Sequence, residues 1–315
     1  MDVSIIIPLF NEEESLAELH RWIRSVCEKN SLRYEVIFVD DGSTDKSWEQ
    51  IVRLKQVDPV VRGIRFRRNY GKSAALNVGF EAATGNVVIT MDADLQDSPE
   101  EIPALHAMIV SGEYDLVSGW KKKRFDPASK TVPTKIFNWA TRVMSGIRLH
   151  DFNCGLKAYA LPVVKSIEVY GEMHRYIPVI AKREGFVHIG EKIVEHRPRQ
   201  FGKSKFGFER FVNGLLDLMT ITFISRFGKR PMHFFGTWGL VMFLIGLAIF
   251  GYIGGYKLYA LWKEIPAKNI ADQSSFFIAL TSMIIGSQLF LAGFLGELIS
   301  RNSPTRNEYH VSETI

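Results

Sequence analysis

Two aspartates one residue apart, Asp92 and Asp94, directly follow the apolar run 87–91, which is typical of a buried parallel strand. The carboxyl ends of such strands form the ligand-binding edge of an open α/β sheet. Two carboxylates at that edge can bind one hard divalent cation. An ordinary solvated turn also favours Asp. The pattern by itself therefore leaves both a metal site and a turn open.

Two earlier strand ends carry similar side chains. Asn11 and Glu12 follow one apolar run, and Asp40 and Asp41 follow the next. A helical pattern separates successive runs, which predicts βαβ units and a doubly wound, mostly parallel α/β sheet. Polar strand ends of such a sheet converge on one crevice, so these residues should lie near Asp92. The strands are expected at residues 3–9, 34–39, 61–66 and 87–91.

The glycine-rich phosphate loops of two large enzyme classes are missing from the sequence. No Gly-x-Gly-x-x-Gly follows the first strand, and Gly-x-x-x-x-Gly-Lys-Ser/Thr occurs nowhere. Their absence argues against a dinucleotide dehydrogenase and a P-loop phosphotransferase. What remains is a nucleotide held by side chains, with a divalent cation bridging its phosphates to Asp92 and Asp94. Such a cation neutralises a diphosphate leaving group, which suits displacement of a nucleotide from a sugar.

The composition is that of a folded chain with a local excess of basic residues. Its 315 residues leave room for one large domain and a further part, and the formal charge is +5. Cys27 and Cys154 form no disulfide framework or metal-ligand pattern, so a reducing compartment is expected. The first residues lack the basic and apolar segments of a signal peptide. We therefore expect a cytosolic first domain, and we expect no nucleic-acid partner.

The chain changes character near Pro231. Residues 234–256 and 276–296 contain no charged residue, and each run is close to the ~20 residues of a membrane-spanning helix. Basic residues flank the pair, and positive-inside reasoning places both termini in the cytosol. We expect an integral membrane protein of a bacterial inner membrane. Its last part, 231–315, should be a two-helix transmembrane hairpin with a short cytosolic tail.

Residues 206–230 join the two parts. Their apolar side chains recur at helical spacing, which fits either an amphipathic helix at the membrane interface or an ordinary core helix. The position directly before two spans favours the interface. The expected organisation is thus a cytosolic catalytic domain over 1–205, this juxtamembrane helix, and the hairpin.

Seven motifs occur in order along nearly the whole chain. The chain resembles the inverting family 2 glycosyltransferases with a GT-A fold, and specifically the polyprenyl-phosphate (dolichyl- or undecaprenyl-phosphate) glycosyltransferases. The ordered set is far more specific than any one motif. The matching segments are residues 7–12, 40–43, 69–72, 92–99, 151–155, 174–178 and 199–205.

The resemblance implies a role for each matching residue. Asp92 and Asp94 would bind Mg²⁺ or Mn²⁺ together with the donor diphosphate. Gln96 would lie beside the transferred sugar or the acceptor phosphate, and Asp151 near the reacting centre. The donor nucleotide would contact Pro8, Asn11, Glu12, Asp40, Asp41 and Lys72. The far wall of the pocket would contain His174 and Arg175. A loop that grips phosphate groups would contain Arg199, Lys203 and Lys205.

Several of these roles have plainer alternatives. Pro8 and Gly155 could serve backbone shape only, and Glu12 could be a helix-capping charge. Cys154 is expected to be a small buried hydrophobic residue rather than a nucleophile. Asp151 could be a general base or could orient a basic residue or a sugar hydroxyl. A phosphate monoester is largely ionised at neutral pH, with a second pKa of about 6, so it needs positioning more than deprotonation.

The implied acceptor accounts for the membrane part of the chain. A polyprenyl phosphate lies in the bilayer with its head group at the cytosolic interface, whereas a nucleotide sugar is soluble. Cationic side chains at that boundary should attract the phosphate. The candidates are Lys121, Lys122, Lys123, Arg124, Lys130 and Lys135. The product would supply sugar for a surface glycan or lipid after transfer across the membrane by a flippase, and the enzyme could be a homo-oligomer.

Three alternative functions fit the sequence less well. A processive polysaccharide synthase would share the sheet, but such enzymes usually carry a Gln-x-x-Arg-Trp motif and more spans. A non-catalytic scaffold that binds lipid carriers would not need acidic clusters at all three strand ends. A small transporter subunit would need an ionisable residue inside its spans, which 234–256 and 276–296 lack.

Overall fold

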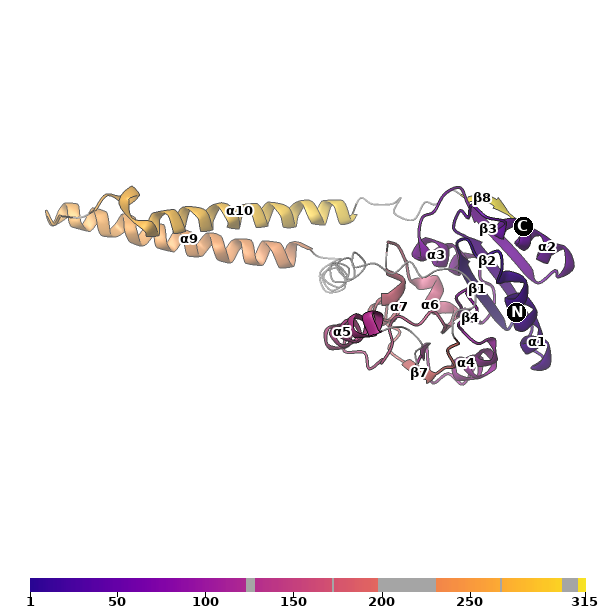
Figure 1. Cartoon of the computed structure of the whole chain (residues 1–315). Coiled ribbons are helices and arrows are strands. Elements are labelled where there is room, and N and C mark those ends of the chain that lie inside the picture. The colour runs from indigo at the N-terminus through magenta and orange to yellow at the C-terminus, as the bar shows by residue number, and fades with distance from the viewer. Residues whose placement is uncertain (123–127, 172, 198–230, 267, 302–310) are drawn as a thin grey trace. The chain divides into compact units, whose positions relative to one another are not determined.

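The computed structural model describes residues 1–122, 128–171, 173–197, 231–266, 268–301 and 311–315. The chain divides into two compact units (Figure 1). One unit comprises residues 1–222 together with 306–315, and the other comprises 223–305. The boundaries expected at 205 and 230 both fall outside the described residues. The amphipathic helix expected at 206–230 also lies outside them.

The first unit is built on one mixed sheet. Its strands are β1 (Val3–Leu9), β2 (Tyr34–Asp40), β3 (Val61–Phe66), β4 (Val87–Thr90), β5 (Leu116–Trp120), β6 (Lys157–Ala160), β7 (Ile189–Ile193) and β8 (Val311–Thr314). Their spatial order is β7-β5-β6-β4-β1-β2-β3-β8. The neighbours β1–β2, β1–β4, β2–β3 and β5–β7 are parallel, whereas β6 is antiparallel to both β4 and β5. The sheet is thus doubly wound about β1, as the sequence predicts.

Helices cover both faces of this sheet. They are α1 (Leu16–Lys29), α2 (Ser47–Val57), α3 (Lys72–Ala82), α4 (Ile102–Val110), α5 (Ala128–Ser145), α6 (Leu161–Ser166) and α7 (Ile177–Arg183), with short turns η1 (Pro99–Glu101) and η2 (Met173–Tyr176). α1 contacts α2 and α4, and α3 contacts α6. Because both faces are covered, the inner strands are mostly apolar, and every residue of β1 and β2 is buried.

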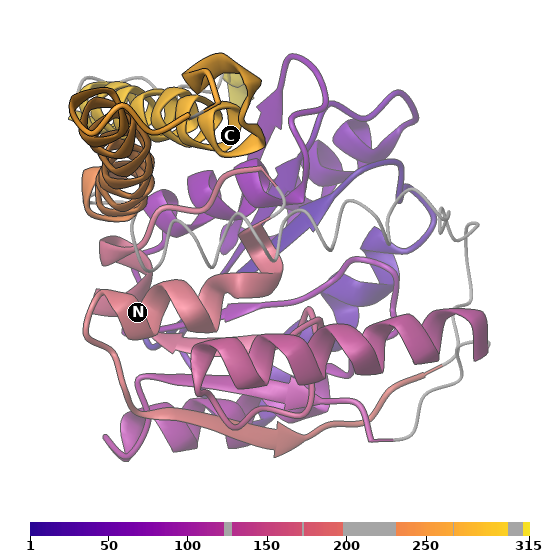
Figure 2. The same cartoon turned by 90° about the vertical axis from the view of Figure 1, so that its left-hand side faces the viewer.

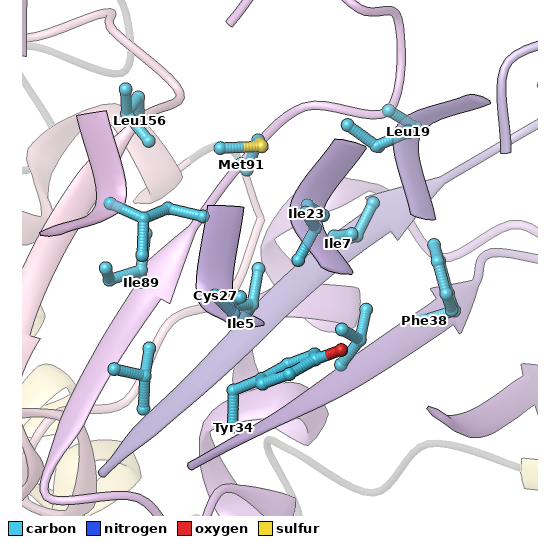
Figure 3. Packing of buried hydrophobic residues seen from close by; sticks show 14 of the residues in the cluster. Ile5, Ile7, Leu19, Ile23, Cys27, Tyr34, Phe38, Ile89, Met91 and Leu156 are labelled. Carbon is cyan, nitrogen blue, oxygen red and sulfur yellow. The ribbon is translucent and has the colours of Figure 1, made fainter. Parts of the chain in front are cut away.

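Alternation along β1 shows how the two layers pack. Ile5 and Ile7 belong to the same core cluster as Leu19 and Ile23 of α1 (Figure 3). Ile6 points to the opposite face, where it lies against Gly79 of α3. Successive side chains of a strand point to opposite faces, so one apolar run supplies both cores. Packing on both faces therefore holds β1 at the centre of the unit.

The second unit contains two long apolar helices that lie side by side (Figures 1 and 2). They are α9 (Pro231–Trp262) and α10 (Ser274–Arg301), joined through η3 (Ile270–Asp272). Within them, residues 232–262 and 274–296 are long and apolar enough to cross a membrane. Gly239 and Gly286 let the backbones approach, because a Cβ at either glycine would come within 2.6 Å of the other's carbonyl oxygen.

The last strand of the sheet comes from the end of the chain. β8 runs antiparallel to β3, with Arg65 opposite Glu313. The carboxylate of Glu313 accepts a hydrogen bond from the indole nitrogen of Trp48 at 3.0 Å. The sequence predicts only a short cytosolic tail here and gives no sign of this strand. Its pairing depends on the open edge of β3, which is more than 240 residues away in the sequence.

Candidate active site

The order of the sheet reverses between β1 and β4. The chain moves outward from β1 to β2 and β3, and then returns to place β4 on the other side of β1. Loops leaving two strands in opposite directions open a crevice at their carboxyl ends, where doubly wound folds bind ligands. The segment after β1 begins at Phe10, and the segment after β4 leads to Asp92. The acidic pair therefore lies at this switch point, as expected from the sequence.

The loops after β1 and β2 are tied together by side chains. The backbone N–H of Asn11 donates to the hydroxyl of Ser43 at 2.9 Å, and the Asn11 side-chain oxygen accepts from the backbone of Thr44 at 2.8 Å. The backbone N–H of Glu12 donates to the hydroxyl of Ser47 at 2.9 Å. Asn11 has a φ of 59°, a left-handed conformation that Asn tolerates well. These contacts join the loops after β1 and β2 into one wall of the candidate site.

Pro8 lies near the exit of β1 and is buried. The pairing of β1 with β4 ends at Ile6 and Thr90, so Pro8 lies beyond that ladder. Proline has no N–H to donate, and a position without a β4 partner tolerates it. This location fits the plainer alternative of backbone shape. Its contact with a nucleotide stays a prediction.

Asp41 organises the next loop rather than pointing into open space. One carboxylate oxygen accepts the backbone N–H of Tyr70 at 2.7 Å, and the other accepts that of Gly71 at 2.9 Å. Burial raises the pKa of Asp41 to about 6, although these two hydrogen bonds oppose the shift. Its neighbour Asp40 is also fully buried, and burial raises its pKa while Arg65 at 3.5 Å opposes the rise. Asp41 thus fixes the path of the chain into α3.

The raised pKa of Asp41 predicts a titration in the mildly acidic range. The native state binds the proton between the ordinary value of 3.8 and about 6, so the contribution of Asp41 to stability is present below 3.8 and is lost as the pH rises through about 6. We expect the carboxyl ¹³C signal of Asp41 to titrate with a midpoint near 6 and to be missing in Asp41→Asn. A midpoint near 3.8 would contradict this environment.

Asp92 lies among positive charges. Its Oδ1 accepts a short hydrogen bond from the ammonium of Lys72, the first residue of α3. Burial by itself would raise the pKa of Asp92, but Lys72, Lys121 and Lys157 outweigh it and hold the pKa well below its usual range. Gly155 lies directly against this carboxylate, because a Cβ there would come within 2.5 Å of Asp92 Oδ2. A glycine is therefore required for Asp92 to occupy this position.

Lys121 has a different role from the one the sequence suggests. It is expected among the surface lysines that attract an acceptor phosphate, but only 12% of its side chain is exposed. Its ammonium lies 2.7 Å from Oδ1 of the fully buried Asp97. Burial alone would lower the pKa of Lys121, but Asp97 and then Asp92 raise it above the usual value. The sequence could not show this, because the basic run 121–124 looks like a solvated surface.

Lys157 is a further buried cation that sequence reasoning missed. It opens β6, is 3% exposed, and donates a short hydrogen bond to the carbonyl of Cys154. Burial lowers its pKa, and the charges of Asp151 and Asp92 oppose the decrease. The available signal was a lysine at the start of an otherwise apolar strand. Cys154 is buried, and burial raises the pKa of its thiol to about 12, as expected for a small hydrophobic residue.

Asp94 and Gln96 form the rest of the acidic loop. Asp94 is half-buried, and its Oδ1 accepts the backbone N–H of Gln96 at 3.2 Å. Gln96 is joined to Arg197 twice, through its side-chain amide at 3.3 Å and through its backbone carbonyl at 3.0 Å. The loop therefore contacts the chain just before residue 198, where the described part stops. Leu95 between them has a φ of 60°, which turns the loop sharply.

The Asp151 loop is held by two neighbours. Glu191 of β7 accepts the backbone N–H groups of His150 at 2.7 Å and Asp151 at 3.1 Å. Asn138 of α5 donates to the carbonyl of His150 at 2.9 Å. Asp151 itself is 1% exposed, and its Oδ1 accepts the N–H of Asn153 at 3.0 Å. The carboxylate of Asp151 therefore helps to stabilise the conformation of its own loop.

His174 lies against the first turn of α3. Its backbone N–H donates to the hydroxyl of Ser73 at 3.0 Å, and its Nδ1 lies 3.2 Å from the same oxygen. This contact brings the His174–Arg175 segment next to Lys72. Of the acceptor lysines, Lys130 lies in α5 and Lys135 is exposed on the same helix. Arg199, Lys203 and Lys205 lie outside the described residues, and so do Lys123 and Arg124.

Solved structures with this fold include a sugar transferase. Glucosyl-3-phosphoglycerate synthase of Mycobacterium tuberculosis, in complex with uridine diphosphate, aligns with a TM-score of 0.56 over 71% of this chain and 79% of its own, at 18% identity. The same enzyme with Mn²⁺, uridine-diphosphate-glucose and phosphoglyceric acid aligns with a TM-score of 0.54 at 19% identity. The fold is therefore that of the GT-A class, as the sequence predicts.

The sequence comparisons identify the family. The model of glycosyl transferase family 2 matches residues 4–161. Dodecaprenyl-phosphate galacturonate synthase of Rhizobium johnstonii is 33% identical over 96% of this chain and 88% of its own length. Undecaprenyl-phosphate 4-deoxy-4-formamido-L-arabinose transferase of Salmonella choleraesuis is 34% identical over 99% and 93%. The chain belongs to glycosyltransferase family 2, and it is an enzyme of that class.

Proposed function

We propose that this protein catalyses the metal-dependent, inverting transfer of a single sugar from a nucleotide sugar to a polyprenyl phosphate, undecaprenyl or dolichyl phosphate. The observation that carries the proposal is the similarity over nearly full length to relatives named for transfer to undecaprenyl or dodecaprenyl phosphate. The acidic pair at the switch point of the sheet supports the same chemistry. The sugar and the nucleotide base are left to experiment.

The carboxylates of Asp92 and Asp94 are suitable ligands for a magnesium or manganese ion. Asp92 and Asp94 are partly exposed carboxylates on one short loop. No group of three or more His, Cys, Asp or Glu side chains that could hold a metal occurs among the described residues. Mg²⁺ typically binds one or two carboxylates plus substrate phosphates and water, so two carboxylates suffice here. When bound, the ion would neutralise charge on the diphosphate leaving group.

The protein's own residues supply binding and orientation. The wall formed by Asn11 and the Asp40–Asp41 loop would hold the nucleoside, and Lys72 would reach the phosphates. The built-in position of Asp151 supports an orienting role over that of a general base, since its Oδ1 is engaged by Asn153. An acceptor phosphate that is already ionised needs only to be aligned with the sugar carbon.

The second unit would place the reaction at a membrane. We assign α9 and α10 as the two spans, with the catalytic unit and both termini on the cytosolic face. This location lets a soluble nucleotide sugar meet a lipid head group. The product would then require a flippase to reach the other face. The proposal also includes a homo-oligomer of the enzyme.

The direct test uses the purified full-length protein in detergent. It is mixed with undecaprenyl phosphate, Mg²⁺ and a panel of nucleotide sugars, and both nucleoside diphosphate release and lipid mass are read. One donor that gives a metal-dependent, sugar-shifted lipid would support the proposal and name the sugar. Release without a lipid product would point to another acceptor. No release from any donor by folded protein would favour a non-catalytic scaffold.

Lys203 and Lys205 give a separate prediction. Lys203→Ala combined with Lys205→Ala should raise the apparent KM for the lipid acceptor by about tenfold, because charge-assisted contacts to phosphate are lost. The KM for the nucleotide sugar and kcat should change little. Steady-state kinetics with each substrate varied in turn measure this. Lys29→Met, an exposed change at the end of α1, serves as the control. Unchanged acceptor kinetics would remove the phosphate-gripping role.

A further inference from the structure

Lys72 contacts the carboxylate that the proposed function assigns to a divalent cation. Its ammonium donates to Oδ1 of Asp92, and the two side chains are 34% and 32% exposed. Both partners can therefore be reached from solvent. Lys72 is the first residue of α3 and follows Gly71, whose φ is 94°. The side chain thus starts at the turn that enters α3 and reaches Asp92 in the segment after β4.

The other two lysines near Asp92 are held in place. Lys121 is paired with the fully buried Asp97 at 2.7 Å, and only 12% of its side chain is exposed. Lys157 is 3% exposed and donates to the carbonyl of Cys154. Moving either lysine would leave a buried charge or carbonyl without its partner, which is costly. Among the three, Lys72 is the cation that can change partner at low cost.

A divalent ion bound at Asp92 would share that carboxylate with the ammonium of Lys72, which contacts Oδ1. Two cations on one carboxylate repel each other, and the repulsion is strong where water screens it poorly. A metal that binds alone would therefore have the ammonium of Lys72 as a second positive charge on the same carboxylate. A diphosphate changes this balance, because its anionic oxygens offer the ammonium a new charge-assisted partner.

We propose that Lys72 is a positioning residue that couples metal binding to donor diphosphate binding through its exchange between Asp92 and phosphate. The inference deepens the proposed function and rests on it. Coupling of this kind is reciprocal, so the diphosphate favours the metal as much as the metal favours the diphosphate. The enzyme would then take up metal and donor together, and neither would bind tightly alone.

This role predicts that one substitution strengthens metal binding and weakens pyrophosphate binding. Lys72→Met keeps an unbranched side chain of nearly the same length but removes its charge. Mn²⁺ should then bind the protein about tenfold more tightly in the absence of nucleotide, because its competitor is gone. Metal-free pyrophosphate should bind about tenfold more weakly, because a cation for its oxygens is lost. A merely structural role for Lys72 would weaken both affinities.

The experiment uses the full-length protein in detergent. Mn²⁺ affinity is measured by electron paramagnetic resonance, and pyrophosphate affinity by calorimetry in the presence of EDTA. Lys72→Arg keeps the charge and should leave both affinities near those of the unmodified protein. Lys29→Met, a remote exposed change, should also leave both unchanged. Tighter Mn²⁺ together with weaker pyrophosphate supports the coupling. An unchanged or weaker Mn²⁺ affinity in Lys72→Met, or an unchanged pyrophosphate affinity, would overturn it.

Two further variants separate this inference from the proposed function. Asp92→Asn and Asp94→Asn should each lose most of the Mn²⁺ binding. If both variants bind Mn²⁺ as the unmodified protein does, the metal assignment is wrong and the coupling falls with it. If both lose Mn²⁺ but Lys72→Met gains no affinity, the metal assignment stands and only the coupling is overturned.

Discussion

Asp94→Asn is expected to lower the rate of sugar transfer by at least about 10³-fold, while the protein stays folded. The amide removes one of the two charges that would hold the cation beside the leaving diphosphate. It keeps an oxygen that can accept the N–H of Gln96, as Asp94 does at 3.2 Å. The loop should therefore keep its shape. The measurement is kcat/KM for the donor at saturating Mg²⁺, with thermal unfolding as the check on folding.

A matched change elsewhere isolates the role of the charge. Asp115 precedes β5, at the opposite end of that strand from Lys121, and pairs with His188 at 3.3 Å. Asp115→Asn removes the same charge and should leave transfer within about twofold of the original rate. Full activity in Asp94→Asn would show that this carboxylate does not hold the metal. Equal losses in both variants would indicate a general effect of charge.

Lys121→Met should destabilise the catalytic unit by about 3–5 kcal/mol, because it leaves the fully buried Asp97 without its cation. Breaking one side of a buried ion pair costs far more than removing a surface charge. The same change should also disturb Asp92, whose backbone N–H faces Asp97 Oδ2 at 3.5 Å. Chemical unfolding of the protein in detergent, followed by tryptophan fluorescence, measures the loss.

The neighbouring lysine is the natural control for this loss. Lys122 is exposed, and Lys122→Met should change the free energy of unfolding by less than about 0.5 kcal/mol. Asp97→Asn added to Lys121→Met should restore part of the stability, since the stranded charge is then removed. If Lys121→Met and Lys122→Met change the free energy of unfolding equally, Lys121 is an ordinary surface lysine. Failure of the double variant to recover would argue against the pair.

Much of the fold could be predicted from local patterns. Apolar runs that end in Asn11, Asp40 and Asp92 mark strand ends, and the helical patterns between them require a parallel arrangement. Because parallel strands end at one edge, their polar ends had to lie near each other. The two charge-free runs near the end of the chain likewise predict long apolar helices. These features depend on residues close together in the sequence, so their periodicity alone reveals them.

The partners of the charged residues could not be predicted in this way. The prediction that Asp41 helps to shape a nucleoside pocket stays a prediction, and the sequence did not reveal that its carboxylate accepts the backbone N–H groups of Tyr70 and Gly71. Lys121 looks like part of a solvated basic run, and Lys157 like an ordinary strand residue. Which carboxylate each one meets depends on how β5 and β6 are placed in the sheet. The roles given to Arg199, Lys203 and Lys205 stay predictions.

Local sequence patterns thus predict the kinds of element, the edge of the sheet at which the acidic pair lies, and the family. Tertiary structure decided which cations surround Asp92, that Gly155 must lie against it, and that residues 311–314 close the edge of β3. The difference lies in how far apart the interacting residues are in the sequence. Secondary structure follows from patterns repeated every few residues, whereas an ion pair or an added strand joins residues far apart in the chain. Only the packed sheet brings such residues within reach of each other.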